Sequence, residues 1–241
     1  MYLNMKIISL IELTRGTGIS QYLSSFAMIE KENLMIIDTN KHTILEDLLG
    51  ITTTSKEISR YAKYNYFNNK NCYELEIFFC RFHNLYIRSL QFSEKPDVDL
   101  IINIVEYIKS LRSFKNCKYL IVYFPFRNYS SDINQIVSNF DYSVIFCDSK
   151  PLIKSELIKH LEIIAERRKY IGFVYTKSEE NSQYPIESES ILIKPLGILP
   201  YNLIIQNATI NNKVFLEIDG KNRHANTIRE VWNKIKSKVA V

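Results

Sequence analysis

The sequence predicts an α/β fold with a mostly parallel sheet and helices on both of its faces. Two observations support this class. Short apolar runs alternate along the chain with amphipathic stretches, and these runs are continuously apolar instead of alternating with polar residues. Strands that are buried on both faces have this composition. No repeat, low-complexity region or linker-like stretch divides the chain, so we expect a single domain over residues 1–241.

The elements follow from these two patterns. The expected strands are, in chain order, Met5–Leu13, Leu34–Ile37, Lys118–Phe124, Tyr142–Cys147, Tyr170–Tyr175 and Ile191–Leu199. The expected helices, with apolar residues at helical spacing, are Gly16–Ile29, Asp99–Leu111, Ile153–Arg168 and Ala225–Val239. The Tyr- and Asn-rich stretch Tyr61–Asn71 is expected to be a loop. Tyr73–Phe79 and Leu85–Leu90 are expected to form an antiparallel pair at the sheet edge.

Composition narrows the functional classes. The net charge of +5 permits contact with nucleic acid or an anionic membrane but does not require it. The 4 cysteines contain no C-x-x-C pair and lie in or beside apolar runs, which predicts buried free thiols. The 4 histidines have no metal-ligand spacing, so we expect no metal. No signal peptide or spanning segment is recognisable, and a cytoplasmic location is expected.

The most informative segment lies between the first strand and the first helix. Gly16, Gly18 and Ser20 occupy a loop that leads from a buried strand into a helix. Glycines allow backbone N–H groups to turn towards an anion, and the helix N-terminus adds a partial positive charge. A tight strand-to-helix turn explains the same residues equally well.

The order of the segments resembles the ParA/MinD group of deviant P-loop ATPases, within the SIMIBI class. That group has a K-G-G-x-G-K-[ST] loop, and the matching stretch here is Thr14-Arg15-Gly16-Thr17-Gly18-Ile19-Ser20. Leu34–Asn40 resembles the group's second strand, which ends in an aspartate, here Asp38. Leu45–Ile51 is similar to the loop after that strand. The later matches are Lys118–Pro125 to the Walker B strand, Ile171–Lys177 to the strand that ends in a base-contacting Asn, and Leu196–Ala208 to a late turn that leads to a helix.

The departures from this pattern fall on residues that would do the chemistry. Ile19 stands at the P-loop lysine, Thr14 at the signature lysine, Tyr123 at the Walker B aspartate and Thr176 at the base-contacting Asn. The resemblance assigns residual nucleotide-binding positions to Arg15, Gly16, Thr17, Gly18, Ile19, Ser20 and Asp38. Asp38 matches the carboxylate that orients the attacking water, although a turn or helix-capping role explains it equally well. We therefore expect no catalytic residues, no cofactor or metal, and weak or absent ATP binding.

The resemblance implies an inactive pseudo-ATPase that serves as a binding, scaffold or regulatory protein in DNA partition or intracellular positioning. Its partner would be a second copy or an active ParA-type paralogue. An active or nucleotide-binding ATPase in which Arg15 replaces the lysines remains an alternative.

Two further partners follow from the helices. Candidate DNA-contacting residues are Lys150, Lys154, Lys159, Arg167, Arg168 and Lys169, although a solvated basic face is the commoner explanation. The last helix places Trp232 in an apolar stripe that fits either packing on the sheet or a membrane-associated adaptor, and packing is favoured.

Overall fold

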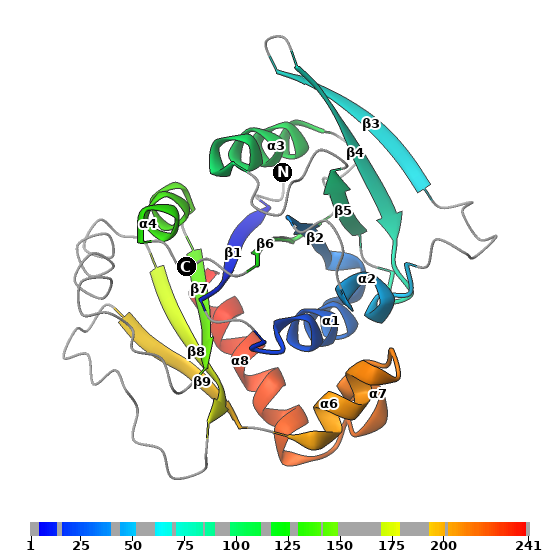
Figure 1. Cartoon of the computed structure of the whole chain (residues 1–241), viewed down its shortest axis with the longest axis vertical. Helices are drawn as coiled ribbons and strands as arrows, with labels where there is room; N and C mark the ends of the chain where they lie inside the picture. The colour runs from blue at the N-terminus through cyan, green and yellow to red at the C-terminus, as the bar shows by residue number, and fades with distance from the viewer. Residues whose placement is uncertain are drawn as a thin grey trace.

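A single nine-stranded sheet joins the described parts of the chain, in the order β3-β4-β5-β2-β6-β1-β7-β8-β9 (Figure 1). The computed structural model describes residues 5–13, 16–39, 44–51, 61–68, 71–83, 85–89, 97–111, 117–125, 130–140, 142–148, 170–178, 193–200 and 202–239. The central strands are β1 (Lys6–Glu12), β2 (Leu34–Asp38), β6 (Tyr119–Phe124) and β7 (Tyr142–Asp148). The others are β3 (Tyr61–Asn68), β4 (Asn71–Phe79), β5 (Leu85–Ser89), β8 (Tyr170–Ser178) and β9 (Ile193–Pro200). Only the two pairs that β4 makes, with β3 and with β5, are antiparallel, which confirms the mostly parallel sheet.

Helices cover both faces of the sheet, as predicted. One face carries α1 (Ile19–Glu30), α2 (Ile44–Leu48), α6 (Leu203–Ile210), α7 (Phe215–Ile218) and α8 (Arg223–Val239). The other carries α3 (Val98–Ser110) and α4 (Ser130–Asn139). A short 3-10 helix, Lys31–Asn33, connects α1 to β2.

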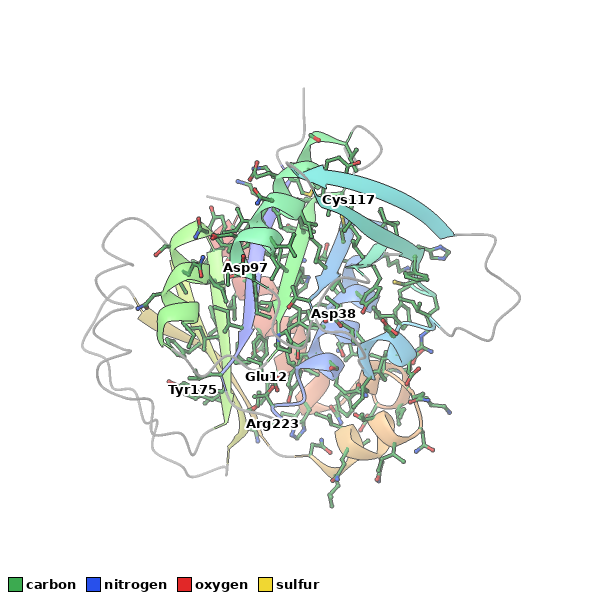
Figure 2. All side chains as sticks on the ribbon, turned by 45° about the horizontal axis from the view of Figure 1, so that its top comes forward. Glu12, Asp38, Asp97, Cys117, Tyr175 and Arg223 are labelled. Carbon is green, nitrogen blue, oxygen red and sulfur yellow. The ribbon has the colours of Figure 1, made fainter. Side chains whose placement is uncertain are left out.

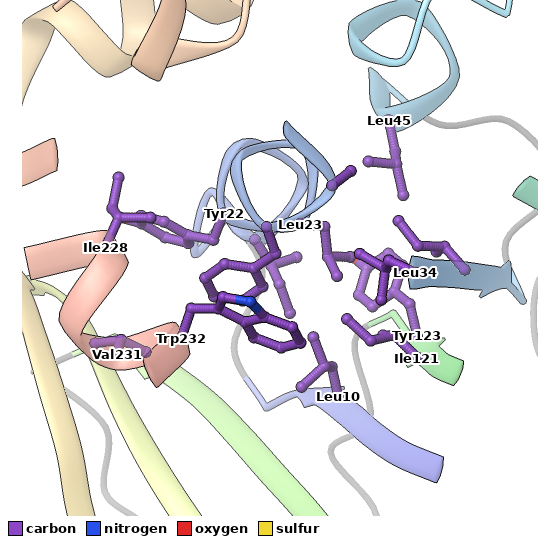
Figure 3. Packing of buried hydrophobic residues seen from close by; sticks show 14 of the residues in the cluster. Leu10, Tyr22, Leu23, Leu34, Leu45, Ile121, Tyr123, Ile228, Val231 and Trp232 are labelled. Carbon is purple, nitrogen blue, oxygen red and sulfur yellow. The ribbon is translucent and has the colours of Figure 1, made fainter. Parts of the chain in front are cut away.

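The apolar stripe of α8 packs into the core between α1 and the sheet (Figure 3). Trp232 is fully buried and stacks on Phe26 with the ring centroids 4.8 Å apart. Its indole Nε1 donates a hydrogen bond of 2.8 Å to Glu30, and Lys236 forms an ion pair with the same carboxylate. Packing on the sheet, the alternative that the sequence favours, is therefore the arrangement in the structure. Of the helices that the structure describes, none is long and apolar enough to cross a membrane.

One sequence-based expectation is wrong. Most of the expected loop Tyr61–Asn71 is the edge strand β3, which pairs with β4 from Tyr61↔Phe78 to Asn68↔Asn71. Its asparagines disfavour a strand, but an edge strand has only one neighbour, and its tyrosines favour extended backbone. The segment Leu45–Ile51, which resembles a loop of the ParA/MinD group, begins inside the helix α2 (Ile44–Leu48), in which Leu45 and Leu48 are both buried. The expected helix Ile153–Arg168 lies outside the described residues, and α4 was not anticipated.

Candidate functional site

The candidate site lies where three parallel strands end beside the start of α1. Tyr123 on β6 is in register with Leu10 of β1 on one side and with Asp38 of β2 on the other. Glu12 ends β1 and Asp38 ends β2, and both lie near the centre of the molecule (Figure 2). The topology therefore brings Glu12, Tyr123 and Asp38 to one edge of the sheet, as expected for the carboxyl ends of parallel strands.

The described part of the loop between β1 and α1 turns at two glycines. Gly16 and Gly18 have φ angles of 75° and 78°, a left-handed conformation that side chains disfavour. Gly18 is the N-cap of α1, so the loop leads directly into the positive end of that helix. The glycines that the sequence singled out are therefore required by the turn.

A carboxylate of the chain itself accepts hydrogen bonds from Thr17 in this turn. Oε1 of Glu12 accepts one bond of 3.2 Å from the backbone N–H of Thr17 and another of 2.8 Å from its hydroxyl. Oε2 accepts a bond of 3.0 Å from the hydroxyl of Tyr123. Glu12 is only 8% exposed. Glu12 was missed as a site residue, because in the sequence it is only a charged residue within an otherwise apolar run.

A second polar cluster surrounds Asp38. Its carboxylate is fully buried and accepts a hydrogen bond of 3.1 Å from the hydroxyl of Tyr86 on β5. The same hydroxyl lies 3.2 Å from Oε1 of Glu46 on α2. One phenolic proton serves one acceptor at a time, so Tyr86 links the two carboxylates. Tyr86 was missed because it lies 48 positions from Asp38, and Glu46 was missed because it meets Asp38 only through Tyr86.

Burial and negative charge both act on Tyr123. Burial of its hydroxyl raises the pKa well above the ordinary value of 10.0, and the charges of Glu12 and Asp38 raise it further. At neutral pH Tyr123 is therefore a neutral hydrogen-bond donor. It cannot supply the anionic oxygen that an aspartate at this position offers to Mg²⁺.

The other predicted positions differ in their surroundings. Ile19 is 2% exposed and belongs to the apolar core, whereas Ser20 at the start of α1 is partly exposed. Thr176 is buried and donates a hydrogen bond of 3.3 Å to the carbonyl of Cys147.

Several predicted residues cannot be placed. Thr14 and Arg15 lie outside the described residues, as does every candidate DNA-contacting residue between positions 150 and 169. Within the described part of the chain, no group of three or more His, Cys, Asp or Glu residues could hold a metal ion.

Comparisons with known proteins find similar solved structures but no match by sequence. No family model matches the chain, and no curated protein does. MinD of Aquifex aeolicus superposes with a TM-score of 0.64 at 13% identity, covering 96% of this chain and 97% of MinD. MinD of Pyrococcus furiosus gives 0.60 at 14% identity, with coverage of 96% and 98%.

A ParA family ATPase of Chlorobium tepidum is a further structural match. It gives a TM-score of 0.59 at 13% identity and covers 96% of this chain and 98% of its own. At such low identity the likeness bears on the fold, and it extends over almost the whole chain. The chain therefore has the fold of the MinD and ParA ATPases, which confirms the fold expected from its sequence.

Proposed function

We propose that this protein is a pseudo-ATPase with the ParA/MinD fold that acts by binding a protein partner, as a scaffold or regulator in DNA partition or intracellular positioning. The observation that carries the proposal is the environment of Ile19. This side chain stands at the P-loop lysine position, yet it is packed in the apolar core. The position thus provides no cation for the phosphates of a nucleotide.

The chemistry of phosphoryl transfer explains why this loss matters. The reaction depends almost entirely on positioning and on neutralising the charge of the transferred group. One lost stabilising contact of this kind costs about 3–4 kcal/mol of transition-state stabilisation. Here the lysine position holds isoleucine and the metal-supporting position holds the neutral Tyr123. Two such losses together would remove detectable turnover.

The structural neighbours suggest what function can survive without hydrolysis. One is described as a complex of MinC with MinD, so a protein with this fold binds a protein partner. Others are described with Mg-ADP or ATP bound. We propose that this chain retains partner binding, to a second copy or to an active ParA-type ATPase, without a nucleotide-controlled switch. A ligand shifts a conformational equilibrium only if it binds the two states differently.

Titration calorimetry with Mg-ATP, combined with a phosphate-release assay, tests the proposal. We expect neither heat of binding at micromolar ATP nor phosphate release. Hydrolysis that is lost in Ser20→Ala or Asp38→Asn, but kept in the matched helix variant Ser24→Ala, would contradict the proposal. Ser24 is a suitable control because its hydroxyl bonds within α1, to the carbonyl of Gln21.

The same titration addresses the alternative in which Arg15 replaces the lysines. Micromolar ATP binding by the wild-type protein that is lost in Arg15→Ala would favour an altered but functional nucleotide site. Equal absence of binding in both proteins agrees with the pseudo-ATPase.

A further inference from the structure

Glu12 accepts the backbone N–H and the hydroxyl of Thr17, two donors in the segment where an active P-loop directs its donors at phosphate. We propose that this loop does hold an anion, and that the anion is the carboxylate of Glu12. The inference rests on the proposed function, because a loop filled by its own carboxylate has no room for a phosphate at the same donors. It adds the reason why the loop keeps its shape without a nucleotide.

The geometry is that of a tethered ligand. Glu12 is the last residue of β1, and Thr17 returns to it only five residues later. Both oxygens of the carboxylate are used: Oε1 accepts the N–H and hydroxyl of Thr17, and Oε2 accepts the hydroxyl of Tyr123. Hydrogen bonds to a charged acceptor are about twice as strong as neutral ones. These contacts join the loop to β6.

Tethering also explains why free phosphate would lose the competition. A group that is attached by a few residues has an effective concentration of at least about the millimolar range. It binds without the loss of translational freedom that a free ligand suffers. Without the lysine at position 19, phosphate has little affinity with which to overcome that advantage.

Removing the carboxylate would leave its hydrogen-bond donors without an acceptor. In Glu12→Ala the backbone N–H of Thr17 and the hydroxyl of Tyr123 lose their acceptor inside a buried site. A buried donor without an acceptor is strongly unfavourable. Inorganic phosphate could then enter the loop and restore these hydrogen bonds, so the missing side chain would be replaced chemically.

The experiment measures the thermal midpoint of the whole protein in potassium chloride and in potassium phosphate at equal ionic strength. Phosphate stabilises proteins in general, so a control is essential. Ser9→Ala provides it, because Ser9 lies on the same strand and its hydroxyl makes a buried hydrogen bond of 2.7 Å to Ser143. We expect Glu12→Ala to lower the midpoint by about 3–10 °C in chloride, and phosphate to recover a larger part of this loss than in Ser9→Ala or the wild type.

A second variant keeps the test decisive if Glu12→Ala does not fold. Glu12→Ser removes the carboxylate and leaves a small polar side chain in the buried site, so no negative charge opposes phosphate, which should stabilise this variant selectively as well. Equal stabilisation by phosphate of the Glu12 variants, Ser9→Ala and the wild type would overturn the inference. That result leaves the proposed function standing, whereas micromolar Mg-ATP binding by the wild-type protein would contradict the proposed function itself.

Discussion

The hydroxyl of Tyr123 lies 3.0 Å from Oε2 of Glu12, across the boundary between two parallel strands. Successive side chains of a strand point to opposite faces, so Glu12 emerges on the same face as Leu10, the register partner of Tyr123. Both Leu10 and Tyr123 belong to the cluster beneath α1. The hydrogen bond therefore lies on the face of the sheet that α1 covers, next to the turn that contains Thr17.

Tyr123→Phe should destabilise the protein by about 1–3 kcal/mol, because a buried charged acceptor then loses a donor. Urea unfolding measures this change in the free energy of unfolding. Tyr119→Phe on the same strand is the matched control, because no hydrogen bond of its hydroxyl is present among the described residues. Equal effects of the two substitutions would show that the bond to Glu12 contributes nothing.

Alkaline pH should weaken the fold through Tyr123. Its pKa is raised in the folded protein, by burial first and then by the charges of Glu12 and Asp38. The unfolded chain releases this proton near pH 10, while the folded protein keeps it. The contribution of Tyr123 to the free energy of unfolding is therefore fully present below about pH 10. It is lost as the pH rises above this value, by about 1.4 kcal/mol per pH unit for one proton.

Urea unfolding between pH 9 and 11 tests this dependence. In Tyr123→Phe the free energy of unfolding should fall less steeply with pH than in the wild type, by the amount that corresponds to about one proton. The same slope in both proteins would mean that Tyr123 ionises alike in the folded and unfolded states.

The central strands β1, β2, β6 and β7 could be predicted because each contains a continuous apolar run, a local signal. The polar contacts of the site could not, because their partners are far apart in sequence: Tyr123 and Glu12 are separated by 111 positions, and Tyr86 and Asp38 by 48. Glu12 alone is indistinguishable from any charged residue at a strand end. Strand β3 was missed because its polar composition resembles a loop, and its pairing with β4 decides its conformation.

Gln21 connects the turn at the start of α1 to the α6–α7 segment, and its removal should loosen that segment. The side chain is 1% exposed; it donates to the hydroxyl of Thr209 and the carbonyl of Lys213, and accepts from the N–H of Phe215. Gln21→Ala should cost about 2–4 kcal/mol in unfolding free energy, because buried backbone groups lose their partners.

Hydrogen exchange locates this effect. We expect faster exchange in residues 203–219 of Gln21→Ala, and unchanged exchange in α3. The control Gln135→Ala removes only an exposed hydrogen bond of 2.9 Å to Asp99 and should stay within about 0.5 kcal/mol of the wild type. Unchanged exchange in residues 203–219 would rule out the connecting role of Gln21.

The packed stripe of α8 leads to a prediction about membranes. Ile228, Val231, Trp232 and Ile235 are each at most 1% exposed, so the apolar face is already occupied by the core. Flotation with anionic liposomes should leave the full chain in the unbound fraction. Comigration with the liposomes that is lost on truncation of residues 225–241 would contradict this expectation, provided that the truncated protein is folded.

The close approach of β9 to α8 depends on Gly197. A Cβ atom at this position would overlap Cγ2 of Val231, and the branched side chain of valine has essentially one rotamer in a helix. Gly197→Ala should therefore cost about 1–3 kcal/mol in unfolding free energy by pushing α8 from the sheet.

Val231→Ala alone should also destabilise, by about 2 kcal/mol, because it leaves a cavity. In the double variant the added methyl occupies part of that cavity. The loss of unfolding free energy in the double variant should therefore be smaller than the sum of the two single losses by about 1 kcal/mol or more. A double-mutant cycle by urea unfolding measures this coupling, and strict additivity would mean that the contact does not determine the distance between α8 and β9.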